Sequence, residues 1–365
     1  MTLLVTAQEV EQMIDMSTCI ELMETVFIEE ANGKAVNHPR QRYTVPKQVP
    51  PNTPAWWTNM IGGASESAGF AALRVDSGIV RELVVDTKRR MEWDYPDGRS
   101  WGFVLLFDLS SGKPVVIFQD FSLSPIRVAA TNAVASKRLA RPGARTLTLL
   151  GSGNEAERHI EALLLVHDLT EISVYSPNKS HLETFVERMT TRHNVELKIV
   201  TNLQQSIAKA DVIVCATNSS EPVFDGRWLT KGQLVISIVN TDHNTIRTEV
   251  DATTFKRSNR IILTSIDTAL SNNQVELLNL IDEKSVSWDQ ISELGKVLSG
   301  ASIGRSSSDD LIYYKNNCGV GIQFAAVGAL IHSACANGGY GTEIPTELFG
   351  ADITSWLDRG FKPSP

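Results

Sequence analysis

The sequence predicts an α/β protein in which a doubly wound parallel sheet is inserted in a second, α+β domain. Its 365 residues exceed the size at which a single hydrophobic core usually stops growing, so two domains are expected. Between Arg145 and Ser265 apolar runs alternate with helical patterns, which is typical of a parallel sheet. Extended segments precede this region, and an apolar helix from Gly321 to Ala336 follows it. Because that helix is too apolar to lie in solvent alone, we expect it to return to the first domain.

The part of the chain before the parallel sheet is expected to form helices first and strands afterwards. Two capping-box patterns within residues 6–21 predict two short amphipathic helices. From Pro39 to Asp120 extended segments follow, and residues 103–118 predict a hairpin around a Ser-Ser-Gly-Lys turn. Ser124 and Pro125 predict the N-cap and the first position of an alanine-rich helix that ends near residue 140.

The apolar strand 145–150 breaks at a glycine elbow, residues 151–153, and the chain continues as a helix. Gly151 permits the tight turn, Gly153 lets backbone N–H groups approach a pyrophosphate, and the small Ala156 lets the helix pack closely on the strand. The helix N-terminus places the positive end of its dipole at the phosphates. Glycine pairs also mark ordinary turns, but the flanking strands and helix favour a Rossmann-type dinucleotide site. Its expected contacts are Gly151, Ser152, Gly153, Asn154, Glu155 and Ala156.

The end of the next strand indicates which dinucleotide is bound. An acidic residue there would accept hydrogen bonds from the ribose 2′-hydroxyl of NAD, whereas a 2′-phosphate requires neutral or basic neighbours. The strand ends in Ser176, and Asn178 and Lys179 follow, so NADP(H) is favoured and NAD(H) is the alternative. Asn178 and Lys179 also suit the solvated start of a helix. At the carboxyl end of a later strand, the residues expected to line the nicotinamide side are Ala216, Thr217 and Asn218.

Composition and cysteine spacing argue against several classes of protein. The formal net charge of −8 comes without a block of Lys and Arg that would neutralise phosphates, so no nucleic-acid partner is expected. The four cysteines lack C-x-x-C spacing, which argues against a zinc site and fits reduced thiols in the cytoplasm. The N-terminus lacks the pattern of a signal peptide, and no apolar run is long enough to span a bilayer. We therefore expect a cytoplasmic protein without a metal or a membrane partner.

Several segments together resemble the ornithine cyclodeaminase/mu-crystallin family along nearly the whole chain. They are Gly33–Arg40, Gly69–Arg74, Ser124–Ala130, Leu150–Ala156, Asp211–Thr217, Glu293–Gly295, Gly304–Arg305 and Gly341–Thr342. The resemblance implies a Rossmann domain, expected at residues 129–310, between the halves of a substrate-binding and dimerisation domain, residues 1–128 plus 311–365. It also implies a homodimer, a bound nicotinamide cofactor, and α-amino or α-imino acids as substrates.

The motifs of that family place Arg40 and Arg127 as a clamp for the substrate carboxylate. A guanidinium offers a planar fork that binds a carboxylate bidentately, and it stays charged at any working pH. Arg127 also falls in the expected first turn of its helix, where a cation is unfavourable unless an anion lies nearby. The alternatives are a solvated loop residue for Arg40 and a structural ion pair for Arg127.

The chain departs from the family at the residues that would move a proton. Members with cyclodeaminase or ketimine reductase activity usually have a lysine at position 74, but an arginine does not release its proton, so Arg74 is expected to bind substrate. In the loop 240–244, Asp242 is the first candidate and His243 the second for the acid–base role. Either residue alone suits a loop cap equally well. Asn59 lies in a segment that resembles the substrate-facing segment of the family.

These residues favour an NAD(P)H-dependent oxidoreductase that acts on the C–N bond of an α-imino or α-amino acid, as an imine reductase does. Three arginines would hold the carboxylate while a hydride reaches the imine carbon. The first alternative is an ornithine cyclodeaminase-type ammonia-lyase that uses bound NAD, against which the missing lysine argues. The second alternative is a protein that binds NADP(H) and has lost its chemistry. The dinucleotide site would be the same in all three cases.

Overall fold

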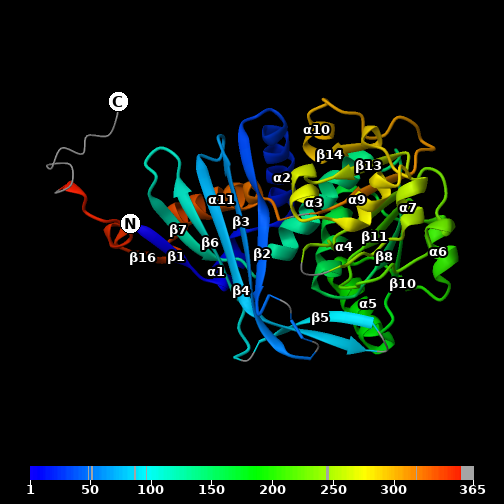
Figure 1. Ribbon diagram of the computed structural model, residues 1–365, viewed down its shortest axis with the longest axis horizontal. Helices are drawn as coiled ribbons and strands as arrows, with labels where there is room; N and C mark the ends of the chain where they lie inside the picture. The colour runs from blue at the N-terminus through cyan, green and yellow to red at the C-terminus, as the bar shows by residue number, and fades with distance from the viewer. Residues whose placement is uncertain are drawn as a thin grey trace.

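The computed structural model describes residues 1–47, 49–50, 52–85, 88–95, 97–243, 246–317 and 319–354. Within these residues two eight-stranded sheets lie side by side, with helices packed around them (Figure 1). The chain starts in the first sheet, forms all strands of the second sheet, and then returns to the first. The predicted fold class, a doubly wound parallel sheet inserted in an α+β unit, is confirmed.

The first sheet is mostly antiparallel. In spatial order its strands are β16 (Thr342–Ile344), β1 (Thr2–Val5), β7 (Pro114–Gln119), β6 (Trp101–Asp108), β4 (Phe70–Val85), β3 (Pro54–Ser65) and β2 (Ala35–Val45), and β5 (Lys88–Asp94) pairs with β4. Its helices are α1 (Ala7–Met13), α2 (Met16–Ala31) and α11 (Gly321–Gly338). The predicted hairpin is confirmed as β6 and β7, in which Leu105 lies opposite Ile117.

In the second sheet every strand runs parallel to its neighbours. The spatial order is β10 (Leu197–Ile199), β9 (Glu171–Tyr175), β8 (Thr146–Leu150), β11 (Val212–Cys215), β12 (Leu234–Ser237), β15 (Ile312–Lys315), β13 (Arg260–Leu263) and β14 (Ile291–Glu293). The helices along this part of the chain are α3 (Leu123–Leu139), α4 (Asn154–Val166), α5 (Lys179–His193), α6 (Leu203–Lys209), α7 (Ala252–Arg257), α8 (Ile266–Ser271), α9 (Val275–Asp282) and α10 (Leu294–Leu298). The strand order reverses between β8 and β11, which is where doubly wound sheets bind ligands.

Helix α11 packs directly on the first sheet, as its apolar sequence predicts. At its start a Cβ on Gly321 would lie 2.0 Å from the backbone carbon of Gly62 in β3, so only glycine allows this approach. Further along the helix, Phe324 and Ile331 are fully buried. The C-terminal part of the chain is therefore anchored to the sheet that its N-terminal part begins.

Two expectations about helix starts are wrong. The second N-terminal helix does not start at Thr18 and is not short, because its N-cap is Asp15 and α2 has 16 residues. Helix α3 begins at Leu123, so Ser124 lies inside it and is not its N-cap. The reason is that Ser124 N–H already donates to the Asp120 carbonyl at 2.9 Å, which starts the helical turn earlier. Arg127 is consequently the fifth helical residue and lies just beyond the first turn.

The expected boundary at residue 311 also needs correction. That boundary places residues 312–315 in the first domain, but they form β15 in the second sheet, between β12 and β13. Tyr313 and Tyr314 are fully buried there. A tyrosine pair beside a lysine gave no clear apolar run, and its burial depends on partners more than 50 residues away in the chain. The return to the first sheet therefore comes after Lys315.

Among the helices of the described ranges, none combines the length and the apolar character that crossing a bilayer would require.

Candidate active site

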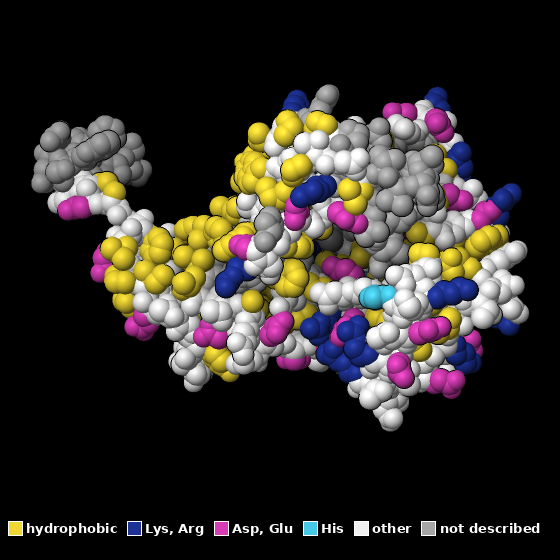
Figure 2. Space-filling view, turned by 90° about the horizontal axis from the view of Figure 1, so that it is seen from below, with side chains coloured by type: hydrophobic (Ala, Val, Ile, Leu, Met, Phe, Trp, Pro, Cys, Tyr) yellow, Lys and Arg dark blue, Asp and Glu magenta, His cyan; other side chains and the backbone are white. Residues whose placement is uncertain are grey.

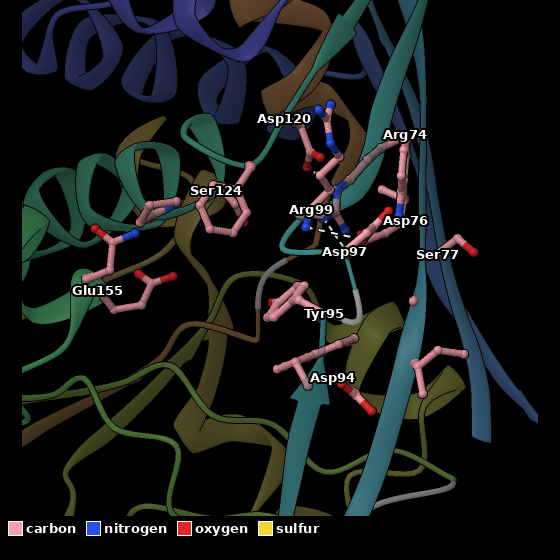
Figure 3. A pocket seen from close by; sticks show the side chains of 18 residues that line it. Arg74, Asp76, Ser77, Asp94, Tyr95, Asp97, Arg99, Asp120, Ser124 and Glu155 are labelled. Carbon is pink, nitrogen blue, oxygen red and sulfur yellow. Dashed lines mark hydrogen bonds and ion pairs between the residues drawn. The ribbon is translucent and has the colours of Figure 1, made fainter. Parts of the chain in front are cut away.

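A cavity of about 730 Å³ lies between the two sheets, beside the start of α4. Strand β4, the end of β5 and the starts of α3 and α4 surround it (Figure 3). The space-filling view shows the surface hollowed between the two halves of the molecule (Figure 2). Because α4 follows β8, at the point where the strand order reverses, the cavity lies where a doubly wound sheet binds its ligand.

The glycine elbow has the geometry that a dinucleotide site requires. Gly151 has a φ of +120°, and a Cβ there would lie 2.2 Å from the carbonyl oxygen of Ala216, so only glycine fits. Helix α4 starts at Asn154 after Gly153, and among the described side chains none caps this N-terminus. Ala156 is fully buried, which allows the close packing expected of it. The first N–H groups of α4 are therefore available to an anion.

The segment after β9 holds no acidic residue from Ser176 to His181. Ser176 is half-buried, Lys179 is exposed, and the side-chain oxygen of Asn178 caps α5 by accepting the His181 N–H at 3.2 Å. Sequence reasoning missed His181, whose Nδ1 shares a hydrogen bond of 2.9 Å with Ser152 Oγ in the elbow. The available signal was a histidine in the first turn of the helix that follows this strand.

The residues predicted for the nicotinamide side follow β11. Ala216 is buried, Thr217 is half-buried and Asn218 is exposed. The Glu249 carboxylate accepts hydrogen bonds from Thr217 N and Oγ1 at 2.8 and 2.7 Å, and from two backbone N–H groups after β12 at 2.8 and 3.0 Å. Glu249 thus holds the carboxyl ends of β11 and β12 together, a role that no local sequence pattern indicates.

Arg74 lies in the cavity wall and is neutralised by the protein itself. Its Nε donates to Asp120 Oδ2 at 2.5 Å and its Nη2 donates to Asp76 Oδ2 at 2.7 Å; we call these three residues the Arg74 triad. Burial opposes the charge of Arg74, but the two carboxylates outweigh it, and the pKa of the guanidinium is raised. Asn59, opposite Asp76 in β3, is buried and is not part of the cavity lining. The positive charge of Arg74 is therefore already offset by the two carboxylates that bind it.

Arg127 is buried in α3, directly behind the cavity wall. It donates to Gln323 Oε1 at 2.9 Å and to Ser124 Oγ, which lines the cavity, at 3.4 Å. Its guanidinium lies 5.2 Å from the centroid of the Phe324 ring, and that of Arg74 lies 5.7 Å from the same ring. No carboxylate of the described residues forms an ion pair with Arg127. This arrangement argues against the structural ion pair that was the alternative for this residue.

The structure brings Arg40, Asp242 and His243 together, but away from the cavity. They line a separate hollow of about 450 Å³ beside the end of α8. His243 is exposed, and its Nε2 donates to the carbonyl of Ser271 at 2.9 Å. Asp242 is buried and forms an ion pair with Arg42 Nη1 at 2.5 Å. The first candidate for the acid–base role is therefore already engaged by an arginine.

Arg42 is the arginine of β2 that sequence reasoning missed. Besides binding Asp242, its guanidinium lies 5.2 Å from the centroid of the Trp57 ring. The rings of Trp57 and Trp93 pack edge to face with their centroids 4.4 Å apart, and Trp93 lines the cavity. This chain of contacts joins the hollow that contains Asp242 to the cavity. A second arginine two positions after Arg40, on a strand, was the available signal.

Comparison with known proteins agrees with this geometry. The sequence model of the ornithine cyclodeaminase/mu-crystallin family matches residues 89–339. A Delta(1)-pyrroline-2-carboxylate reductase of Bacillus cereus is 28% identical over 246 residues, which cover 67% of this chain and 74% of that protein. The protein of the same description from Colwellia psychrerythraea is 30% identical over 58% of this chain and 67% of its own length.

Solved structures show the same fold. The Delta(1)-pyrroline-2-carboxylate reductase of Thermococcus litoralis, in complex with NADH and L-proline, superposes with a TM-score of 0.80 over 94% of this chain and 100% of that one, at 24% identity. The iminosuccinate reductase of Paracoccus denitrificans, in complex with NAD+, gives a TM-score of 0.78 over 94% of this chain and 99% of that one, at 23% identity.

Proposed function

Because the chain belongs to the ornithine cyclodeaminase/mu-crystallin family, we propose that it is an NADPH-dependent reductase of the C=N bond of an α-imino acid. One observation carries the proposal: the uncapped start of α4 and the glycine elbow lie beside a cavity of about 730 Å³ with charged walls. Sequence relatives described as reductases of a cyclic imino acid support the reaction class.

The residues at the elbow fit a nicotinamide dinucleotide. The backbone at Gly151 leaves no room for a Cβ, and the first N–H groups of α4 would bind the pyrophosphate. The absence of an acidic residue from Ser176 to His181 favours a 2′-phosphate, for which Lys179 and His181 would supply positive or donor groups. When bound, the reduced nicotinamide supplies a hydride. The protein then contributes orientation and charge.

Two guanidinium groups would hold the substrate carboxylate. Arg74 and Arg127 both lie within 6 Å of the Phe324 ring centroid, but Asp76 and Asp120 offset the charge of Arg74. Because Arg74 is balanced by its two carboxylates, Arg127 would provide most of the attraction. The carboxylate would fix the imine carbon in the cavity, where orientation accounts for much of the rate.

We further propose that the protein is a homodimer that pairs through the outer face of the first sheet. Helix α11 covers the other face. Strand alternation and pairing register place large exposed apolar side chains together on the outer face, and they are Leu4, Val36, Tyr43, Val45, Trp56, Leu73 and Phe103. A patch of this kind is typical of an interface. A monomeric mass by light scattering for the wild type, or a dimeric mass for Phe103→Glu, would contradict this assignment.

The reaction is tested by following NADPH at 340 nm with a panel of cyclic imino acids, and of 2-oxo acids mixed with amines. We expect oxidation of NADPH with at least one cyclic or open-chain α-imino acid. Tight NADPH binding without any turnover would favour the protein that has lost its chemistry. Release of ammonia from a diamino acid without net oxidation of the cofactor would favour the cyclodeaminase-type lyase.

A further inference from the structure

Reduction of a C=N bond needs a proton as well as a hydride, and neither Arg74 nor Asp242 is placed to supply the proton. Arg74 does not release its proton, and Asp242 is bound to Arg42 outside the cavity. We propose that Glu155, in the first turn of α4, is the catalytic residue that protonates the imine nitrogen. This inference rests on the proposed function.

The position of Glu155 brings its carboxyl group to the cavity. It lines the cavity from the α4 side, next to Asn154 and across from the Arg74 triad (Figure 3). Its Oε2 is buried, and no described residue forms a hydrogen bond with it. A buried carboxyl oxygen without a partner is costly, so such an atom at a cavity wall points to a ligand group that completes it.

The backbone of Glu155 is held by buried neighbours. Its carbonyl accepts the Nδ1–H of His159 at 2.6 Å, and His159 Nε2 accepts from Asn132 Nδ2 at 2.6 Å. Burial lowers the pKa of His159 to about 4, so this imidazole is neutral at pH 7. The histidine therefore fixes the start of α4 against α3 without adding a charge beside the carboxyl group.

The charges around Glu155 make it a group that exchanges protons near neutral pH. Burial raises its pKa to about 7, Arg127 on α3 opposes this rise, and Glu249 adds to it. The other charged or titratable side chains that line the cavity are the Arg74 triad, Asp94, Tyr95, Asp97 and Arg99. A general acid works best when its pKa lies near the working pH. At pH 7 about half of the Glu155 carboxyl groups are therefore protonated and able to donate a proton.

Glu157, two residues later on the same helix, shows the contrast. Its carboxylate forms ion pairs with Arg188, at 3.0 Å, and with Arg192, and it does not line the cavity. A glutamate in this turn thus has cationic partners available when it faces α5. Glu155 faces the cavity instead, and Glu157 provides a matched control.

The carbon of the substrate C=N bond gains the hydride supplied by the reduced nicotinamide, and the π electron pair moves to nitrogen. Nitrogen takes the proton from the Glu155 carboxyl group, so the imine becomes an amine. Glu155 is left as a carboxylate and regains a proton from solvent before the next turnover. Activity that depends on this acid falls as the pH rises through about 7.

The test compares Glu155→Gln with Glu157→Gln. Glutamine keeps the shape of the side chain but donates no proton in this step, so we expect kcat to fall at least about 100-fold and the pH dependence near neutrality to disappear. Glu157→Gln should keep kcat and the wild-type pH profile. Neither variant should lose NADPH affinity at pH 6, where the Glu155 carboxyl group is mostly protonated, as measured by quenching of tryptophan fluorescence.

A second readout does not depend on turnover. A pyrophosphate bound at the start of α4 raises the pKa of a nearby carboxyl group, so NADPH binding at pH 8 should take up protons in the wild type and not in Glu155→Gln. Calorimetry in two buffers of different ionisation enthalpy measures this uptake. Equal kcat and equal proton uptake in Glu155→Gln and wild type would overturn the role of Glu155, as would equal losses in both variants. A wild type that binds no NADPH would overturn the proposed function itself, and this inference with it.

Discussion

Arg74 and Arg127 are both buried beside the ring of Phe324, yet their surroundings differ. Arg74, on a strand, has two carboxylates within 2.7 Å of its nitrogen atoms. Arg127, on a helix, binds only neutral oxygen atoms of Gln323 and Ser124 among the described residues. On the strand side of the cavity the charge of Arg74 is thus offset by carboxylates of the protein. On the helix side, Arg127 and Glu155 have no ion-pair partners in the described chain.

This difference indicates which side of the cavity takes part in chemistry. A buried charge without a partner lowers stability, and proteins keep such groups where a ligand completes them. The balanced triad gives the cavity a rigid wall, and the helix side gives it groups that respond to a ligand. Mutations on the two sides should therefore separate stability from activity.

Breaking the ion pairs of the Arg74 triad should cause the largest change, a loss in the free energy of unfolding. Arg74→Met leaves the carboxylates of Asp76 and Asp120 without their cation, and breaking a buried ion pair in this way costs about 3–5 kcal/mol of the free energy of unfolding. Urea denaturation measures the loss. Asp94→Asn is the control, because the Arg81–Asp94 pair is more exposed and is worth about 0–1 kcal/mol. Equal small losses in both variants would show that the triad does not stabilise the strand side.

Arg127→Met should separate activity from stability. Loss of a charge-assisted contact to the substrate carboxylate should lower kcat/KM for the imino acid about 100- to 1000-fold. The NADPH dissociation constant should stay within about twofold, and the free energy of unfolding should fall by no more than about 1–3 kcal/mol, the cost of leaving Gln323 Oε1 without its donor. Steady-state kinetics and urea denaturation check both points. A parallel loss of NADPH affinity would reject Arg127 as the carboxylate clamp.

Glu155 should make stability depend on pH. Its pKa of about 7 in the folded protein lies above the ordinary 4.5, so the folded state binds more protons and loses stability as the pH rises from about 4.5 through 7. Glu155→Gln removes this loss, which corresponds to at most about 3 kcal/mol at pH 8. Urea denaturation at pH 5 and pH 8 measures the gain. Glu157→Gln should show no gain at pH 8, and an equal gain would contradict the assignment.

The smallest expected effect is a change in the preference for NADPH over NADH when His181 is replaced. His181→Ala removes a donor next to the elbow and should weaken NADPH binding about tenfold, which is about 1.4 kcal/mol, while NADH binding changes little. Fluorescence titration with both cofactors checks the difference. Equal weakening of both would mean that His181 supports the elbow through Ser152 and does not contact a 2′-phosphate.

The elbow and the parallel sheet were predictable because their signals are local. A strand, two glycines and a small residue at the start of a helix occupy about a dozen consecutive positions, and Gly151 has the positive φ that such a turn needs. The start of α3 was missed by two residues because its first turn depends on a backbone contact with Asp120.

The rest of the site depends on contacts between distant segments. The pairing of β2 with β3 shifts register between His38 and Gln41, so the position of Arg42 could not be read from the spacing of the arginines. Arg42 meets Asp242 across 200 positions of sequence. In the same way, no sequence pattern near Arg74 indicates that Asp120 binds it and offsets its charge.

The most direct test is a crystal structure of the protein with NADPH and a saturated cyclic amino acid that mimics the product. We predict that the pyrophosphate lies on the first turn of α4 and that the ligand carboxylate lies within hydrogen-bond distance of Arg127. A dinucleotide bound elsewhere, or a ligand carboxylate held by the hollow around Asp242 with Arg127 still bound only to Gln323 and Ser124, would contradict this prediction.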